Sequence, residues 1–176
     1  RGYEGVAGTG RLEEQSYLHQ LGASDVLARS HFEMPSRPLE KARWAGAVDV
    51  VGGRVLASVC ASMKQQGVVT ACGLAGGMDF PATVAPFILR GVTLVGVDSV
   101  MCPKTVRQDA WAQLAARVDK TLLAGMTRVI PLSEVAAAAA DLLDGRVRGR
   151  LVVELPDRKG GRGGAYAKLP VYGWDS

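Results

Sequence analysis

Short apolar runs rich in valine alternate along the chain with segments whose apolar residues recur every three or four positions. The apolar runs predict strands at 3–9, 25–29, 47–53, 67–73, 92–100, 127–132 and 150–155. The periodic segments predict helices at 11–21, 37–44, 54–65, 81–91, 105–125 and 133–145. Nearly apolar strands separated by helices are typical of a parallel sheet that is buried on both faces. The pattern therefore predicts an α/β fold.

Single residues indicate where several of these helices begin, break or end. Pro86 is expected to interrupt the helix at 81–91. Thr105 and Gln108 have the spacing of a capping box, which predicts the start of a helix that runs to Gly125. Ser133 is expected to open the helix at 133–145.

Glycine dominates the turns that follow the predicted strands. In parallel sheets the ligand sits at the carboxyl ends of the strands, and glycine allows the backbone to approach a ligand closely. The turns with this character lie at 8–11, 52–53 and 73–77, and Ser99 lies at the end of the strand predicted at 92–100. Asp49 lies inside an apolar stretch, where it would either orient the site or be satisfied by loop N–H groups.

Thr9, Gly10 and Arg11 end the first predicted strand with no acidic residue. In nucleotide-binding sheets an acidic residue at the end of the second strand selects NAD, whereas a nearby arginine accommodates the 2′-phosphate of NADP. Arg11 and Arg29 offer planar guanidinium donors that match phosphate oxygens. The alternative is an ordinary tight turn, in which Thr9 caps the helix and both arginines are solvated.

Composition narrows the classes of function. Of the residues, 48% are hydrophobic and 22% charged, which is typical of a soluble globular protein. The net charge of +4 comes with no basic stripe, so nucleic acid is not an expected partner. No apolar run is long enough to span a membrane. We therefore expect a cytoplasmic protein.

The few cysteines and histidines argue against several kinds of chemistry. Three widely spaced cysteines predict neither a disulfide framework nor a metal site, and the two histidines have no ligand partner at metal spacing. Cys72 has no histidine nearby to activate it. No Ser-His-Asp set can be assembled, so hydrolysis is disfavoured.

Three segments carry a resemblance to a known family: "SRPLEKARWAGAVDVVGG", "ACGLAGGMDFPATVAPFILRGVTLVGVDSVMCP" and "VRGRLVVEL". The chain from residue 1 to about 155 resembles the NADPH-dependent acrylyl-CoA reductase branch of the medium-chain dehydrogenases/reductases, which is zinc-free and quinone-oxidoreductase-like. The resemblance implies a Rossmann-type, doubly wound parallel sheet over 1–155. Residues 156–176 match nothing in the family, and we expect a flexible tail there.

The resemblance also implies a set of NADPH-binding residues. Thr9, Gly10 and Arg11 match the loop that holds the 2′-phosphate of the coenzyme, and Arg29 matches the basic residue beside it. The other implied contacts are Leu74 and Ile88 along the pyrophosphate and nicotinamide, Ser99 after the sixth Rossmann strand, and Arg150 near the C-terminus.

Parts of the family pattern have no counterpart in this sequence. The first Rossmann strand, its glycine-rich turn and the catalytic domain that precede this point in relatives are not found, so we expect an N-terminally truncated sheet. In the order 3-2-1-4-5-6 the first strand is central. We therefore expect the strands at 3–9 and 25–29 to remain unpaired with the rest, and the chain alone to be inactive. The catalytic residues remain unassigned.

Three functions remain open at this stage. The resemblance favours NADPH-dependent reduction of acrylyl-CoA to propanoyl-CoA by hydride transfer, with this chain as the cofactor-binding part. A quinone or another enone is the alternative substrate. A non-catalytic NADP-binding or dimerisation module is the third reading, because the family pairs two copies through the edge strand near 92–100.

Overall fold

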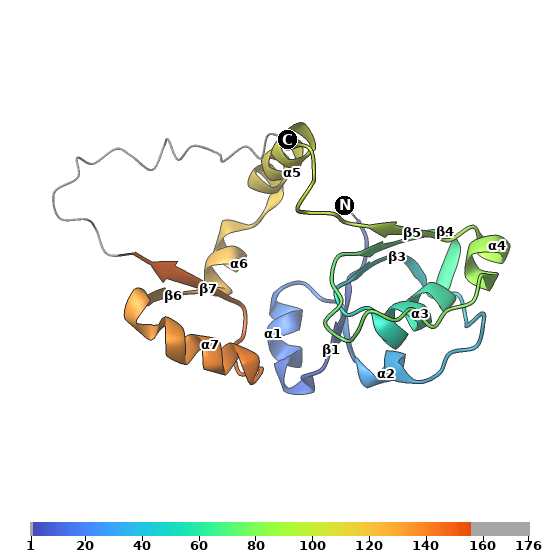
Figure 1. The fold of residues 1–176 in the computed structure, drawn as a ribbon, viewed down its shortest axis with the longest axis horizontal. Coiled ribbons are helices and arrows are strands. Elements are labelled where there is room, and N and C mark those ends of the chain that lie inside the picture. The colour runs from blue at the N-terminus through green and yellow to red at the C-terminus, as the bar shows by residue number, and fades with distance from the viewer. Residues whose placement is uncertain (1, 156–176) are drawn as a thin grey trace. The chain divides into compact units, whose positions relative to one another are not determined.

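The computed structural model describes residues 2–155, so the expected tail at 156–176 lies outside the described residues. The described chain divides into two compact units, the first ending at Gln113 and the second beginning at Leu114. The boundary falls inside helix α5 (Lys104–Arg117). Figure 1 shows the elements of both units along the chain.

The first unit begins with a pair of parallel strands. Strand β1 (Val6–Thr9) pairs in parallel with β2 (Asp25–Ala28). A 3-10 turn, η1 (Leu12–Glu14), and helix α1 (Gln15–Gln20) connect them. A short helix that the sequence pattern did not predict, α2 (Ser30–Glu33), follows β2.

The first unit also contains a three-stranded parallel sheet, in the order β3-β4-β5. Its strands are β3 (Trp44–Asp49), β4 (Met63–Ala71) and β5 (Thr93–Gly96). Helix α3 (Gly53–Ala61) links β3 to β4, and α4 (Ala85–Arg90) links β4 to β5. Figure 1 shows both helices on the same side of this sheet.

The main apolar core lies between α3 and this sheet. It consists of two residues of α3, two of β4 and the residue just before β5: Leu56, Cys60, Met63, Val69 and Val92. Burial raises the pKa of the Cys60 thiol to about 11, and the negative charge of Asp49 adds to the shift. Cys60 therefore stays protonated at neutral pH and serves as a core side chain.

Arg90, the last residue of α4, ties three chain segments together. Its Nη1 donates to the carbonyl oxygens of Ala61 and Met63, both at 2.9 Å, and its Nη2 donates to that of Glu40 at 2.6 Å. Carbonyls at the end of a helix lack intrahelical partners, and a cation there also suits the helix dipole. Arg90 thus closes the end of α3 and holds the start of β4.

The helix predicted at 37–44 is wrong. Residues 35–43 form neither helix nor strand. Pro35 and Pro38 disfavour helical backbone at the residues that precede them. The backbone N–H groups of Glu40 and Arg43 donate to the carbonyls of Ala61 and Ser62, at 3.0 and 2.8 Å. Bonds to the end of α3 therefore replace the bonds of a local helix.

Two further helix boundaries differ from the sequence pattern. The helix predicted to reach residue 65 ends at Ala61, because Met63 already belongs to β4 and is buried in the core. The helix predicted to run unbroken to Gly125 stops at Arg117, and α6 (Lys120–Gly125) begins anew. Asp119 caps α6, since its side chain accepts the N–H groups of residues 121 and 122.

Pro86 and Ser133 also have other positions than expected. Pro86 lies in the first turn of α4, where proline is tolerated, and does not interrupt the helix. Ser133 lies inside a 3-10 turn, η2 (Leu132–Glu134). Helix α7 (Val135–Leu143) follows it and has no side-chain cap.

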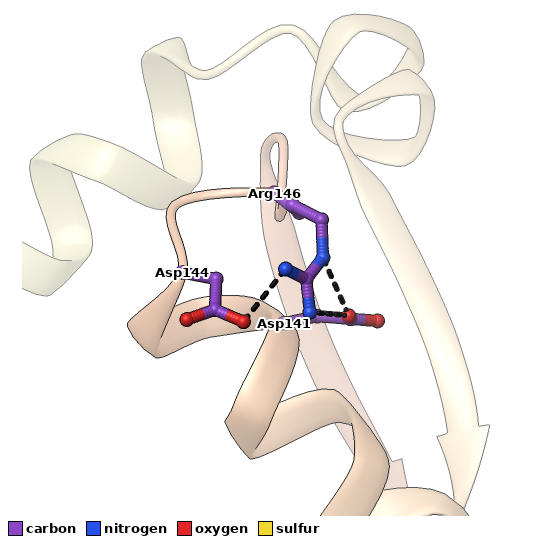
Figure 2. A network of polar contacts seen from close by, with 3 residues as sticks. All are labelled: Asp141, Asp144 and Arg146. Atoms are coloured by element: carbon purple, nitrogen blue, oxygen red, sulfur yellow. Dashed lines mark hydrogen bonds and ion pairs between the residues drawn. The ribbon is translucent and has the colours of Figure 1, made fainter.

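The second unit contains a parallel pair around α7. Strand β6 (Thr127–Pro131) pairs with β7 (Arg150–Glu154). Arg146 stabilises the turn that leads from α7 toward β7, as Figure 2 shows. Its Nε and Nη2 donate to Asp141 at 2.9 and 2.7 Å, and its Nη1 donates to Asp144 at 2.6 Å.

The strand pairing agrees with the expectation of an incomplete central sheet. All strand pairs in the described residues are parallel. Strands β1 and β2 form their own sheet and do not join β3, β4 and β5. No helix in the described part of the chain is both long and apolar enough to cross a membrane.

Candidate functional site

The turn after β1 is closed by the side chain of Thr9. Its Oγ1 accepts the N–H of Arg11 at 3.0 Å and donates to the Arg11 carbonyl at 3.3 Å. The carbonyl of Thr9 accepts the N–H of Arg29 at 2.7 Å, which joins the ends of β1 and β2. The Thr9 side chain therefore shapes the turn itself, and the helical turn that follows has no side-chain cap.

Arg29 lies directly against this turn. A Cβ built on Gly10 would stand 3.3 Å from the Arg29 guanidinium carbon, so a larger residue here would push the guanidinium back by a few tenths of an ångström. Arg29 Nε also donates to Glu33 Oε1 at 2.9 Å, and both side chains are about half exposed. The sequence analysis missed Glu33, although its position four residues after Arg29 on a helix was the available signal.

A second glycine turn follows β3 and is held by a buried carboxylate. Asp49 is only 5% exposed, and its Oδ2 accepts the N–H of Gly52 at 2.7 Å. A loop N–H therefore satisfies this buried carboxylate, as one of the two roles considered for the residue expects. Gly52 and Gly53 have φ angles of +72° and +57°, which other residues rarely adopt. The turn therefore requires both glycines.

The turn after β4 packs against this one, backbone on backbone. The N–H of Gly76 donates to the carbonyl of Val51 at 2.7 Å, and the N–H of Cys72 donates to that of Asp49 at 2.9 Å. A Cβ on Gly73 would lie 2.5 Å from the Val50 oxygen. The two turns thus form one interlocked unit, called here the double turn (residues 49–53 and 72–77).

The predicted site residues fall into separate groups in the structure. Thr9, Gly10, Arg11 and Arg29 come together at the ends of β1 and β2. Leu74 is on the double turn and 60% exposed. The remaining predicted residues are Ile88 on α4, Ser99 after β5, and Arg150 at the start of β7 in the second unit. The carbonyl of Ser99 accepts a hydrogen bond from the Arg107 guanidinium.

The available chemistry is that of binding by cations and by backbone groups. Cys72 is exposed, and its thiol donates to the Asp49 carbonyl at 3.3 Å. Within residues 2–155 no group of three His, Cys, Asp or Glu side chains could hold a metal ion. The arginines beside glycine-rich turns at strand ends suit an elongated anionic ligand.

Comparison with known proteins gives a consistent family. The zinc-binding dehydrogenase family matches residues 21–153. Acrylyl-CoA reductase AcuI of Ruegeria pomeroyi is 48% identical over 155 residues, which is 88% of this chain and 47% of that protein. This chain therefore spans about half the length of the curated relatives that it matches.

Solved structures agree with the predicted fold. The yhdH oxidoreductase from Salmonella enterica, in complex with NADP, aligns with a TM-score of 0.85 at 46% identity, over 88% of this chain and 48% of that one. A relative named putative quinone oxidoreductase YhfP, from Bacillus subtilis, is 45% identical over 88% of this chain and 48% of its own length. Its structure with NAD bound aligns with a TM-score of 0.83. The predicted Rossmann-type α/β class is confirmed.

The packing of the double turn predicts the effect of adding one methyl group. Gly73→Ala would place a carbon against the backbone of Val50, which cannot give way as a flexible side chain would. We expect a loss of about 1–3 kcal/mol in the free energy of unfolding, as for other overpacked sites. Urea unfolding of the full reading frame that contains this chain measures it.

Gly96→Ala is the matched control, because nothing lies within 4 Å of its Cβ position. It should leave the unfolding midpoint nearly unchanged. Equal midpoints for the two variants would show that the double turn tolerates a side chain and is not closely packed.

Proposed function

This chain belongs to the zinc-binding dehydrogenase family, among the medium-chain dehydrogenases/reductases, and we propose that it is the cofactor-binding part of an NADPH-dependent reductase. The observation that carries the proposal is the turn Thr9–Arg11 with the Arg29 guanidinium against it. Its place at the carboxyl ends of β1 and β2 suits the adenosine 2′-phosphate. The NADP complex of the Salmonella relative supports the choice of coenzyme.

The residues of this chain would share the work of binding. Arg11 and Arg29 would hold the 2′-phosphate through charge-assisted hydrogen bonds. Glu33 forms an ion pair with Arg29, whose guanidinium lies beside Gly10, and partly offsets the positive charge of that guanidinium. Leu74, Ile88 and Ser99 would add further contacts to the coenzyme.

We propose an α,β-unsaturated thioester, acrylyl-CoA, as the substrate. A bound nicotinamide would supply the hydride for the β-carbon, and a proton from solvent at the α-carbon would complete propanoyl-CoA. The name of the Ruegeria relative, at 48% identity, supports this choice. No group of three metal-ligating side chains is found in the described part of the chain, and we propose no role for these residues in binding zinc.

A quinone is the second candidate substrate, favoured by the name of the Bacillus relative. We expect the full reading frame to oxidise NADPH faster with acrylyl-CoA than with a quinone, at matched concentrations. Absorbance at the nicotinamide band follows both reactions. Faster turnover of the quinone would contradict the thioester and leave the coenzyme proposal intact.

The coenzyme proposal predicts the effect of removing one guanidinium. Arg11→Ala should weaken NADPH binding by roughly ten- to a hundredfold, because a hydrogen bond to a charged group contributes about 1.5–3 kcal/mol. NADH, which lacks the 2′-phosphate, should bind as before. Titration of the full reading frame with each coenzyme measures the preference.

Arg128→Ala serves as the control, since Arg128 lies on β6 in the second unit and is exposed. It should leave both affinities unchanged. A wild-type preference for NADH, or an unchanged preference in Arg11→Ala, would contradict the proposal. The Bacillus relative binds NAD in its solved structure, which makes this comparison necessary.

We further propose that two copies of this chain associate through β5. Such association is also expected of a non-catalytic binding module. Strand β5 is at the edge of its sheet, and an edge strand offers unpaired backbone groups to a second strand. Val95→Lys should shift the full reading frame from dimer toward monomer in light scattering, because a charge on an edge strand opposes pairing.

Val68→Lys is the matched control, since Val68 is as exposed as Val95 but lies on β4, which is paired with a strand on both sides. It should leave the mass unchanged. A wild-type monomer would overturn the association. Coenzyme binding and dimerisation without turnover would favour the non-catalytic module over the reductase.

A further inference from the structure

Asp49 has contacts that reach beyond its own turn. Its side chain is 5% exposed and accepts the N–H of Gly52, the residue that leads into α3. A buried carboxylate is costly unless it is hydrogen-bonded. The bond at 2.7 Å is short, as expected for a charged acceptor. The carboxylate therefore defines the shape of the turn between β3 and α3.

The backbone of the same residue holds the second half of the double turn. The Asp49 carbonyl accepts the N–H of Cys72 at 2.9 Å and its thiol at 3.3 Å. Asp49 thus contacts the turn after β3 with its side chain and the turn after β4 with its main chain. It is the first of three consecutive residues whose carbonyls join the two turns.

The rest of the double turn leaves little room for either half to move alone. The carbonyls of Val50 and Val51 accept the N–H groups of residues 75 and 76, at 3.4 and 2.7 Å. A Cβ on Gly52 would lie 2.7 Å from the Gly77 oxygen, and one on Gly76 would lie 2.8 Å from a Val51 methyl. A shift of the first turn is therefore passed directly to the second.

Leu74 lies on the second turn and is exposed, so a displaced turn would displace this side chain as well. We propose that Asp49 is a positioning residue: without contacting the coenzyme, it places the 72–77 turn for the pyrophosphate–nicotinamide half. This inference rests on the proposed coenzyme function. The 2′-phosphate half binds at Thr9–Arg11, on the other sheet, and does not depend on Asp49.

The proposal predicts a split between two ligands. Asp49→Ala should weaken binding of NADPH about tenfold in the full reading frame, equivalent to about 1.4 kcal/mol. Binding of 2′,5′-ADP, which carries only the 2′-phosphate half, should change by less than about twofold. Asp49→Asn keeps an oxygen that can accept the Gly52 N–H, so it should recover most of the NADPH affinity. Calorimetric titration measures both ligands.

Asp119→Ala is the matched control. Its carboxylate also accepts backbone N–H groups at a helix start, from Thr121 and Leu122, but it is exposed and lies in the second unit. It should leave both affinities unchanged. If Asp49→Ala does not fold, Asp49→Ser replaces it, because the shorter hydroxyl retains an acceptor. A larger loss of affinity for NADPH than for 2′,5′-ADP in Asp49→Ser would then support the proposal.

The outcomes separate this inference from the function on which it rests. Equal weakening of both ligands would show that Asp49 supports the fold in general and would overturn the positioning role. Unchanged NADPH binding in Asp49→Ala would overturn it as well, while the coenzyme proposal stands. If the wild-type protein binds neither ligand, the proposed function fails, and the positioning role fails with it.

Discussion

The double turn is the constraint on which the three-stranded part of the molecule depends. Two chain reversals, one after β3 and one after β4, meet through their backbones, and any side chain at Gly73 would strike the Val50 carbonyl. The contact fixes how these neighbouring strands end. Because parallel strands present their carboxyl ends at one edge, it also fixes the surface that faces a ligand. Close backbone packing of this kind tolerates no gradual adjustment.

At the opposite end of the strands of this sheet, the Arg90 guanidinium binds the backbone. Arg90 binds carbonyls of Ala61, Met63 and Glu40, and so joins the end of α3, the start of β4 and the extended segment before β3. The core between these two ends is small and includes Cys60, whose thiol has its pKa raised by burial. The Asp49 carboxylate at the carboxyl ends of the strands and the Arg90 guanidinium at the other end thus bind backbone groups where the chain reverses.

Much of the strand pattern and part of the candidate site could be predicted from residue order. Apolar runs located all of the described strands to within a few residues, and Thr9–Arg11 was recognised as a turn beside Arg29. Helix boundaries were less predictable. The segment 37–44 has helical spacing, but its N–H groups find better partners at the end of α3. Glu33, which pairs with Arg29, gave only an i, i+4 spacing as a signal.

The sequence by itself determined the alternation of parallel strands with helices and the family, because periodicity and motif order are properties of neighbouring residues. Only the tertiary structure decided which N–H the Asp49 carboxylate accepts, which carbonyls Arg90 binds, and that residues 35–43 form no helix. The carbonyls that Arg90 binds, for example, lie 27 to 50 positions before it in the chain. The hydrogen-bond partners of such residues depend on the distances and the burial that folding creates, and neither can be predicted from neighbouring residues in the sequence.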